Sequence, residues 1–139
     1  MSEQNKATFI AICDIFNHGS LSKVDALMTN DMIDHDLPPG IDQGIAGFKQ
    51  LVAMYRAAFP DLRSDVKQII AEGDLVAVRL VSRGTHTGPL MGISATGKKI
   101  DIQEFHIGRF VEGKCVEHWG LVDMMTMMQQ LGVMPAQSA

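Results

Sequence analysis

The sequence has few cysteines, no excess of basic residues, no internal repeat and no hydrophobic run long enough to cross a membrane. Two cysteines far apart, Cys13 and Cys115, predict neither a disulfide framework nor a cysteine metal site, and we expect both to be small buried groups. A membrane-spanning helix needs about 20 consecutive apolar residues. We therefore expect no membrane association.

The charge balance argues against nucleic acid as a partner. There are 12 basic and 16 acidic residues, which give a net charge of −4, and the basic residues form no stripe. Residues 1–6 are polar and include an acid, unlike a signal peptide, so we expect a cytoplasmic protein. A chain of 139 residues can bury one sizeable core, which predicts a single domain over residues 1–139.

Hydrophobic periodicity predicts helices in the first half of the chain. Apolar residues at helical spacing indicate a helix over 7–18, which Gly19 ends, and a short helix that Ser22 caps. A third helix over 44–59 ends at Pro60. Between the second and third helices, residues 31–39 read as a short extended piece or turn.

The second half reads mostly as strands. Alternating residues predict strands over 62–71, 75–86, 100–110 and 115–123, followed by a last helix over 124–131. Helices followed by consecutive hairpins indicate an α+β fold. We expect a cone in which a curved, mostly antiparallel sheet of four to six strands packs against three N-terminal helices, with a short C-terminal helix. Its concave face would enclose an apolar pocket.

The hairpin over 100–123 carries the main chemical signal. Glu104 and His106 share one face of their strand, where Ile102 and Phe110 also lie. A carboxylate and an imidazole among apolar residues are costly unless they are paired or used, and burial would raise the pKa of Glu104 towards neutrality. We interpret the two as an acid–base pair; the alternatives are a structural ion pair or a solvated strand face.

Residues throughout the chain match the pattern of one protein family. They are the stretch Gln103 to Asp123 with Gln129-Gln130-Leu131-Gly132, then Asp42-Gln43-Gly44, Gln50-Leu51-Val52, Arg56-Ala57-Ala58-Phe59, Gly84-Thr85-His86-Thr87-Gly88 and Met91-Gly92. On these residues the chain resembles the SnoaL-like polyketide cyclases. That family belongs to the cone-shaped α+β superfamily named after nuclear transport factor 2.

The resemblance implies an activity as well as a fold. Members of the family close the last ring of aromatic polyketides by an intramolecular aldol condensation, without cofactor or metal, and an aspartate is the general acid/base. The resemblance therefore implies a cofactor-free cyclase, or a related lyase or isomerase, that acts on a hydrophobic, carbonyl-bearing small molecule. A dehydratase or an epoxide hydrolase on the same frame is a further alternative.

One position departs from the family pattern. Counted along the return strand, the family's catalytic aspartate falls on Gly120, which cannot transfer a proton. His118 and Asp123 flank this gap. The chain is thus either a cyclase relative with a relocated base or a non-catalytic member that binds a small ligand or serves in assembly.

The resemblance also assigns candidate site residues. His106 falls on the family's pocket histidine, Glu104 on a glutamine and Asp34 on a pocket asparagine. The candidate catalytic residues are His106, Glu104 and Asp123, and the candidate substrate-binding residues are Asp34, His35, Tyr55, His86 and His118. The segment Asp34-His35-Asp36 could suggest a metal site, but no ligand spacing supports one and turn chemistry explains it, so no metal is expected.

Two further patterns concern packing. Met124, Met125, Met127, Met128 and Met134 crowd the C-terminal part, either as adaptable core filling or as a pliable wall around an apolar ligand. Trp119 faces opposite to His118 by strand parity, and with Phe105 and Ile107 it would place large apolar groups on the outer face of the sheet. This predicts a homodimer or a larger homo-oligomer.

Overall fold

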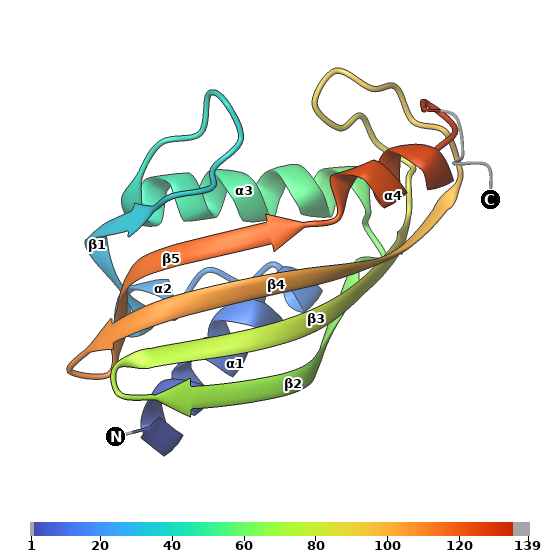
Figure 1. Ribbon diagram of the computed structural model, residues 1–139. Coiled ribbons are helices and arrows are strands. Elements are labelled where there is room, and N and C mark those ends of the chain that lie inside the picture. Colours follow the sequence, from blue (N-terminus) through green and yellow to red (C-terminus); the bar gives the residue numbers. More distant parts are fainter. Residues whose placement is uncertain (1, 135–139) are drawn as a thin grey trace.

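The computed structural model describes residues 2–134, which form four helices and a five-stranded sheet (Figure 1). The first helix, α1 (Ser2–His18), buries Phe9, Ile12 and Cys13 against the sheet. It begins earlier than the predicted residue 7, because the polar residues before it continue the same helix. The chain leaves α1 at Gly19, whose φ of 73° is a left-handed conformation that glycine adopts without strain.

The second helix, α2 (Val24–Leu27), is a single turn. The prediction that Ser22 caps it is wrong: Lys23 occupies the N-cap position and its side chain makes no capping hydrogen bond. The Ser22 hydroxyl instead lies 3.3 Å from that of Ser20. Burial of Val24 in the main core therefore holds this turn in place.

The extended segment that follows is a strand of the sheet. β1 (Met28–Asp34) pairs in parallel with β5 (Lys114–Val122), and this register sets Asp34 opposite His118. The sequence predicted only a short extended piece over 31–39. The pairing matters because it brings the acidic end of β1 beside the C-terminal hairpin.

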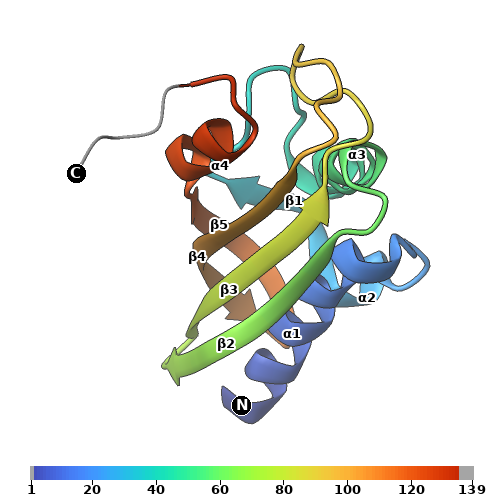
Figure 2. The same ribbon diagram turned by 90° about the vertical axis from the view of Figure 1, so that its right-hand side faces the viewer.

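The other strands form an antiparallel meander. β2 (Arg63–Glu72), β3 (Leu75–Thr85) and β4 (Lys99–Val111) pair in sequence and then join β5, so that the sheet order is β1-β5-β4-β3-β2. Figures 1 and 2 show that the long central strands twist and curve. The predicted α+β architecture with a curved, mostly antiparallel sheet is confirmed.

The remaining helices complete the concave side. α3 (Gly44–Ala58) lies with α1 on one face of the sheet (Figure 2), and α4 (Met124–Gln130) follows β5 directly. Buried side chains form two clusters, one between α1, α3 and the sheet and one around Phe59, Leu90 and Met127. Within the described residues, no helix has both the length and the apolar character that a membrane crossing requires.

Candidate active site

A cavity of about 630 Å³ lies between the helices and the concave face of the sheet. Its wall is mostly apolar and draws on both core clusters. Pockets of roughly 300–1,000 Å³ with few polar groups are typical small-molecule sites. Methionines from three parts of the chain line it, including two of the C-terminal group: Met28, Met32, Met91, Met124 and Met127. Met127 is also buried in the core, so it fills space and forms the cavity wall at once.

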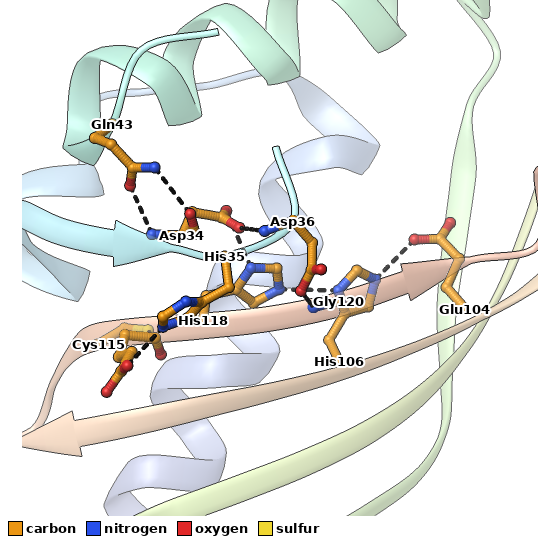
Figure 3. A network of polar contacts seen from close by, with 10 residues as sticks. Asp34, His35, Asp36, Gln43, Glu104, His106, Cys115, His118 and Gly120 are labelled. Carbon is orange, nitrogen blue, oxygen red and sulfur yellow. Dashed lines mark hydrogen bonds and ion pairs between the residues drawn. The ribbon is translucent and has the colours of Figure 1, made fainter. Parts of the chain in front are cut away.

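Four ionisable side chains form a continuous chain along this cavity (Figure 3). Glu104 Oε1 lies 2.8 Å from His106 Nε2, and His106 Nδ1 lies 2.9 Å from His118 Nε2. His118 Nδ1 lies 3.0 Å from Asp34 Oδ2, which is an ion-pair distance without the alignment of a regular hydrogen bond. β4, β5 and β1 therefore bring two carboxylates and two imidazoles into one line.

These contacts indicate where the two rings carry hydrogens. A ring nitrogen that faces a carboxylate must carry a hydrogen, because its lone pair would repel the oxygen. This requirement applies to His106 Nε2 and to His118 Nδ1. The N···N contact between the rings needs one hydrogen between them, and either ring can donate it. The two imidazoles therefore form a line of polar contacts between two carboxylates.

Glu104 is held at both of its oxygens. Its second oxygen, Oε2, accepts a hydrogen bond of 2.5 Å from the Ser82 hydroxyl, which itself lies 2.7 Å from the Ser64 hydroxyl. Burial would raise the pKa of Glu104, but the bond and charge of His106 together with the Ser82 bond outweigh burial and leave the pKa lowered. The expectation of a pKa near neutrality is therefore wrong.

Asp34 is held just as firmly. Gln43 receives a hydrogen bond from the Asp34 backbone N–H at 2.7 Å and donates one to the Asp34 carbonyl oxygen at 2.9 Å. Burial opposes ionisation of the carboxyl, but the close polar contact with His118 and a bond from the Asp36 backbone N–H outweigh it, so the pKa of Asp34 is lowered. Glu104 and Asp34 are thus both stabilised as carboxylates.

Gly120 borders the imidazole pair. A Cβ added at this position would lie 2.6 Å from His106 Nδ1 and 2.9 Å from His118 Cε1. Only glycine leaves room for the two rings as they stand, since real Cβ atoms essentially never come within 3.0 Å of another heavy atom. The Gly120 backbone N–H donates a 2.7 Å hydrogen bond to Asp36 Oδ2, so a carboxylate lies beside the glycine after all.

Two of the predicted binding residues reach the cavity in different ways. Tyr55 lines it from α3, and burial, with the charge of Glu104, raises the pKa of its phenol to about 12. His35 borders the cavity, but its ring stacks on Trp119 with centroids 4.9 Å apart and lies 2.6 Å from a carboxylate oxygen of Glu117. The His35 imidazole therefore contacts Trp119 and Glu117 and is not part of the His106–His118 line.

The structure corrects two predicted site residues. The Asp123 carboxylate accepts bonds from the backbone N–H and the hydroxyl of Thr126 and so caps α4; within residues 2–134 it is not part of the cavity wall. His86 is fully buried beside Phe59, and its Nδ1 bonds to Thr96, which closes the loop after β3. The polar groups of both side chains bond to neighbouring residues, and neither side chain lines the cavity.

Sequence reasoning missed Ser82 and Asp36 as cavity residues. Ser82 shares the inward face of β3 with Leu80, so strand parity could have found it. Asp36 follows the strand, where no periodicity predicts its direction. Both cysteines are buried as expected, and burial raises the pKa of Cys13 to about 12. Within residues 2–134, no group of three or more His, Cys, Asp or Glu side chains could hold a metal ion.

Comparison with known proteins decides the family. The family model described as SnoaL-like polyketide cyclase matches residues 8–131, which is nearly the whole described chain. The chain belongs to the SnoaL-like polyketide cyclase family. Its membership and the identity of its relatives support a cyclase function.

Two relatives of this SnoaL-like chain are methyl ester cyclases. Nogalonic acid methyl ester cyclase of Streptomyces nogalater is 33% identical over 119 residues, which cover 84% of this chain and 89% of the relative. Aklanonic acid methyl ester cyclase AcmA of Streptomyces galilaeus is 29% identical over 114 residues, 75% of this chain and 79% of the relative.

Solved structures show the same SnoaL-like fold. IdmH of Streptomyces antibioticus, proposed to be a polyketide cyclase, has a TM-score of 0.80 at 34% identity over 93% of this chain and 99% of its own. AclR of Streptomyces galilaeus, proposed to be a hydroxylase, has a TM-score of 0.85 at 30% identity over 99% of this chain and 87% of its own. The fold alone therefore does not determine the reaction.

Proposed function

We propose that this protein closes a ring in the methyl ester of an aromatic polyketide acid by an intramolecular aldol reaction. The observation that carries the proposal is the line Glu104–His106–His118–Asp34, which places two imidazoles between two carboxylates on the wall of an apolar cavity. The cyclases among the relatives act on methyl esters of this kind. A cavity of about 630 Å³ has room for a molecule of several fused rings.

The proposed chemistry needs a proton acceptor and a site for negative charge. A base removes a proton from the carbon next to the ester, and the electron pair attacks a ketone carbon to form the new C–C bond. The ketone oxygen becomes an alkoxide and takes up a proton, so the product has the mass of the substrate. Positive charge already oriented in a water-poor cavity stabilises such oxyanions far better than water does.

His106 is the residue best placed to meet the oxygen. Both of its nitrogens are engaged, so a carbonyl oxygen must replace one partner. The bond to His118 is the one to exchange, because the bond to Glu104 orients the ring and holds its charge. His118 and Asp34 then support the charge from the far side. This role for His106 follows the sequence prediction, whereas the Asp123 carboxylate is engaged in capping α4 and is not available as the base.

A non-catalytic ligand-binding protein is the second candidate. It is favoured by Gly120, which lacks the family's aspartate, and by the full set of partners that both imidazoles already have. Such a protein would bind an apolar ester without changing it. The two candidates differ in whether a product forms and in what His106 contributes.

Turnover of two named esters separates these candidates. Nogalonic and aklanonic acid methyl esters are incubated with the protein, and chromatography with mass detection follows the appearance of an isomer of unchanged mass. We expect conversion by the wild type and a fall in kcat of about 10²–10⁴-fold in His106→Gln with its melting temperature kept. The matched control is His18→Gln, an exposed histidine at the end of α1, which should retain full activity.

Two outcomes would contradict the proposal. Binding of both esters without any isomer formed by the wild type would favour the ligand-binding candidate. A His106→Gln protein that melts earlier but converts ester at the wild-type rate would make the Glu104–His106 contact a structural ion pair.

We further propose that two copies of the chain associate through the outer face of the sheet. The support is a cross-strand apolar row made by Ile70, Ala77, Ile107 and Trp119 on β2, β3, β4 and β5. Next to this row lie Phe105 and Leu121, which are 55% and 73% exposed. Contiguous apolar groups on a sheet face mark an interaction surface. The expected cytoplasmic location stays a prediction.

A further inference from the structure

We propose that Asp36 is the base that removes the proton from the substrate carbon, and that it takes the place of the side chain that position 120 lacks. The inference rests on the proposed function and adds a catalytic residue to it. It places the acid–base carboxylate on the segment between β1 and α3 rather than on β5.

The cavity wall has three carboxylates, and two of them are already committed. Both oxygens of Glu104 have partners, His106 and Ser82. Asp34 accepts the Asp36 backbone N–H at one oxygen and faces His118 with the other. Each of these two pKa values lies below its ordinary range, so neither carboxylate gains by taking a proton. Asp36 is the carboxylate that remains.

The geometry of Asp36 suits a proton acceptor. Oδ2 is fixed by the 2.7 Å bond from the Gly120 backbone N–H, and in the described part of the chain Oδ1 has no hydrogen-bonding partner. The residue is exposed and also lines the cavity. One oxygen therefore anchors the group while the other stays available to a substrate hydrogen, which is what a general base requires.

Gly120 explains why the carboxylate comes from another element. A side chain at position 120 would collide with His106 and His118, so the imidazole pair and an aspartate on β5 exclude each other. The space beside the Gly120 backbone N–H is open instead to Asp36, which reaches it from the segment after β1 (Figure 3). The Asp36 backbone N–H also bonds to Asp34 Oδ1 at 3.1 Å, which ties its position to the imidazole line.

Asp36 alone can both take up the substrate proton and return it, so no other proton donor or acceptor is needed. The Asp36 carboxylate takes the proton of the carbon next to the ester, and the electron pair that remains forms the new C–C bond to the ketone carbon. The Asp36 carboxylic acid then gives the proton to the alkoxide that this attack creates. Asp36 ends as a carboxylate, and nothing is oxidised or reduced.

The test replaces the carboxylate by its amide. In Asp36→Asn the amide oxygen can still accept the Gly120 N–H, but it cannot take up a proton. With the two methyl esters named above, we expect kcat to fall about 10²–10⁴-fold while KM stays within about threefold and the melting temperature is unchanged. The matched control, Asp31→Asn, changes an exposed acid of β1 that is not part of the cavity wall and should retain wild-type kcat.

A second variant separates a base from a merely structural acid. Asp36→Ala leaves a space beside Gly120 that formate can enter, and added formate should restore at least about a tenth of the lost rate if the missing function is a carboxylate base. Wild-type kcat in Asp36→Asn, or a loss that formate does not relieve, overturns the assignment of Asp36. A wild-type protein that converts neither ester overturns the proposed function itself, so the two failures are distinguishable.

Discussion

Gly120 and His106 face each other across the β4–β5 ladder, and a Cβ at position 120 would come within 2.6 Å of His106 Nδ1. The imidazole cannot retreat easily, because Glu104 and His118 hold both of its nitrogens. Gly120 stands where the family has its aspartate, and it also leaves the room that the His106 and His118 rings need to lie side by side. Its effect on stability can be measured directly.

Gly120→Ala should destabilise the protein by about 1–3 kcal/mol, because the added methyl group overpacks a filled site. Chemical denaturation with urea gives the free energy of unfolding. The control is the same substitution in a His106→Ala background, where the ring is gone and alanine at 120 should cost far less. Equal costs in the two backgrounds would show that the contact with His106 does not require glycine.

The stability of the protein should fall in acid because of Glu104 and Asp34. Both carboxyl pKa values are lowered in the folded state. A carboxylate with a lowered folded pKa stabilises the fold above its unfolded pKa, about 4, and this contribution is lost as the pH falls through the folded value. We expect the urea midpoint to drop as the pH is lowered below about 4.

Glu104→Gln removes one of these two groups and should make that drop shallower. Asp31→Asn, an exposed acid outside the imidazole line, is the control and should keep the wild-type dependence on pH. If the curves for wild type and Glu104→Gln run parallel between pH 7 and about 3, Glu104 does not contribute to the acid sensitivity.

Asp123 should matter for stability rather than for turnover. Its carboxylate accepts the Thr126 backbone N–H at 3.1 Å and the Thr126 hydroxyl at 2.6 Å. Removing an N-cap side chain costs about 0.5–2 kcal/mol, so Asp123→Ala should lower the free energy of unfolding by that amount with kcat unchanged. Asp123→Asn keeps a capping oxygen and serves as the control. A large loss of kcat in Asp123→Asn would return this residue to the catalytic set.

The sequence predicted which side chains of the hairpin lie together, because strand side chains alternate. Glu104 and His106 had to share a face once their strand was recognised, and the two side chains do meet at 2.8 Å. The same parity placed Trp119 opposite to His118, on the face where it packs against His35. Local periodicity thus carries information about which residues of one hairpin point together.

The rest of the site depends on contacts that no local pattern encodes. Asp34 meets His118 because β1 pairs in parallel with a strand more than eighty residues later. β1 is short, and its few apolar residues do not indicate which strand it pairs with. Asp36 reaches Gly120 from an irregular segment. The prediction for Asp123 was wrong because of a local contact. The Thr126 hydroxyl donates a hydrogen bond to its carboxylate, which therefore caps α4 and is not part of the cavity wall.

Association through the outer face of the sheet gives the last prediction. Ile107 lies in the middle of the apolar row, 41% exposed, between Ala77 and Trp119. Ile107→Lys puts a charge at the centre of the proposed interface and should convert a dimer into a monomer at micromolar concentration, as light scattering after size-exclusion chromatography would show. Ile10→Lys on α1, 44% exposed and on another surface, is the matched control and should remain dimeric. A wild-type protein that elutes as a monomer at the same concentration would contradict the proposal, because the row would then face water without a partner.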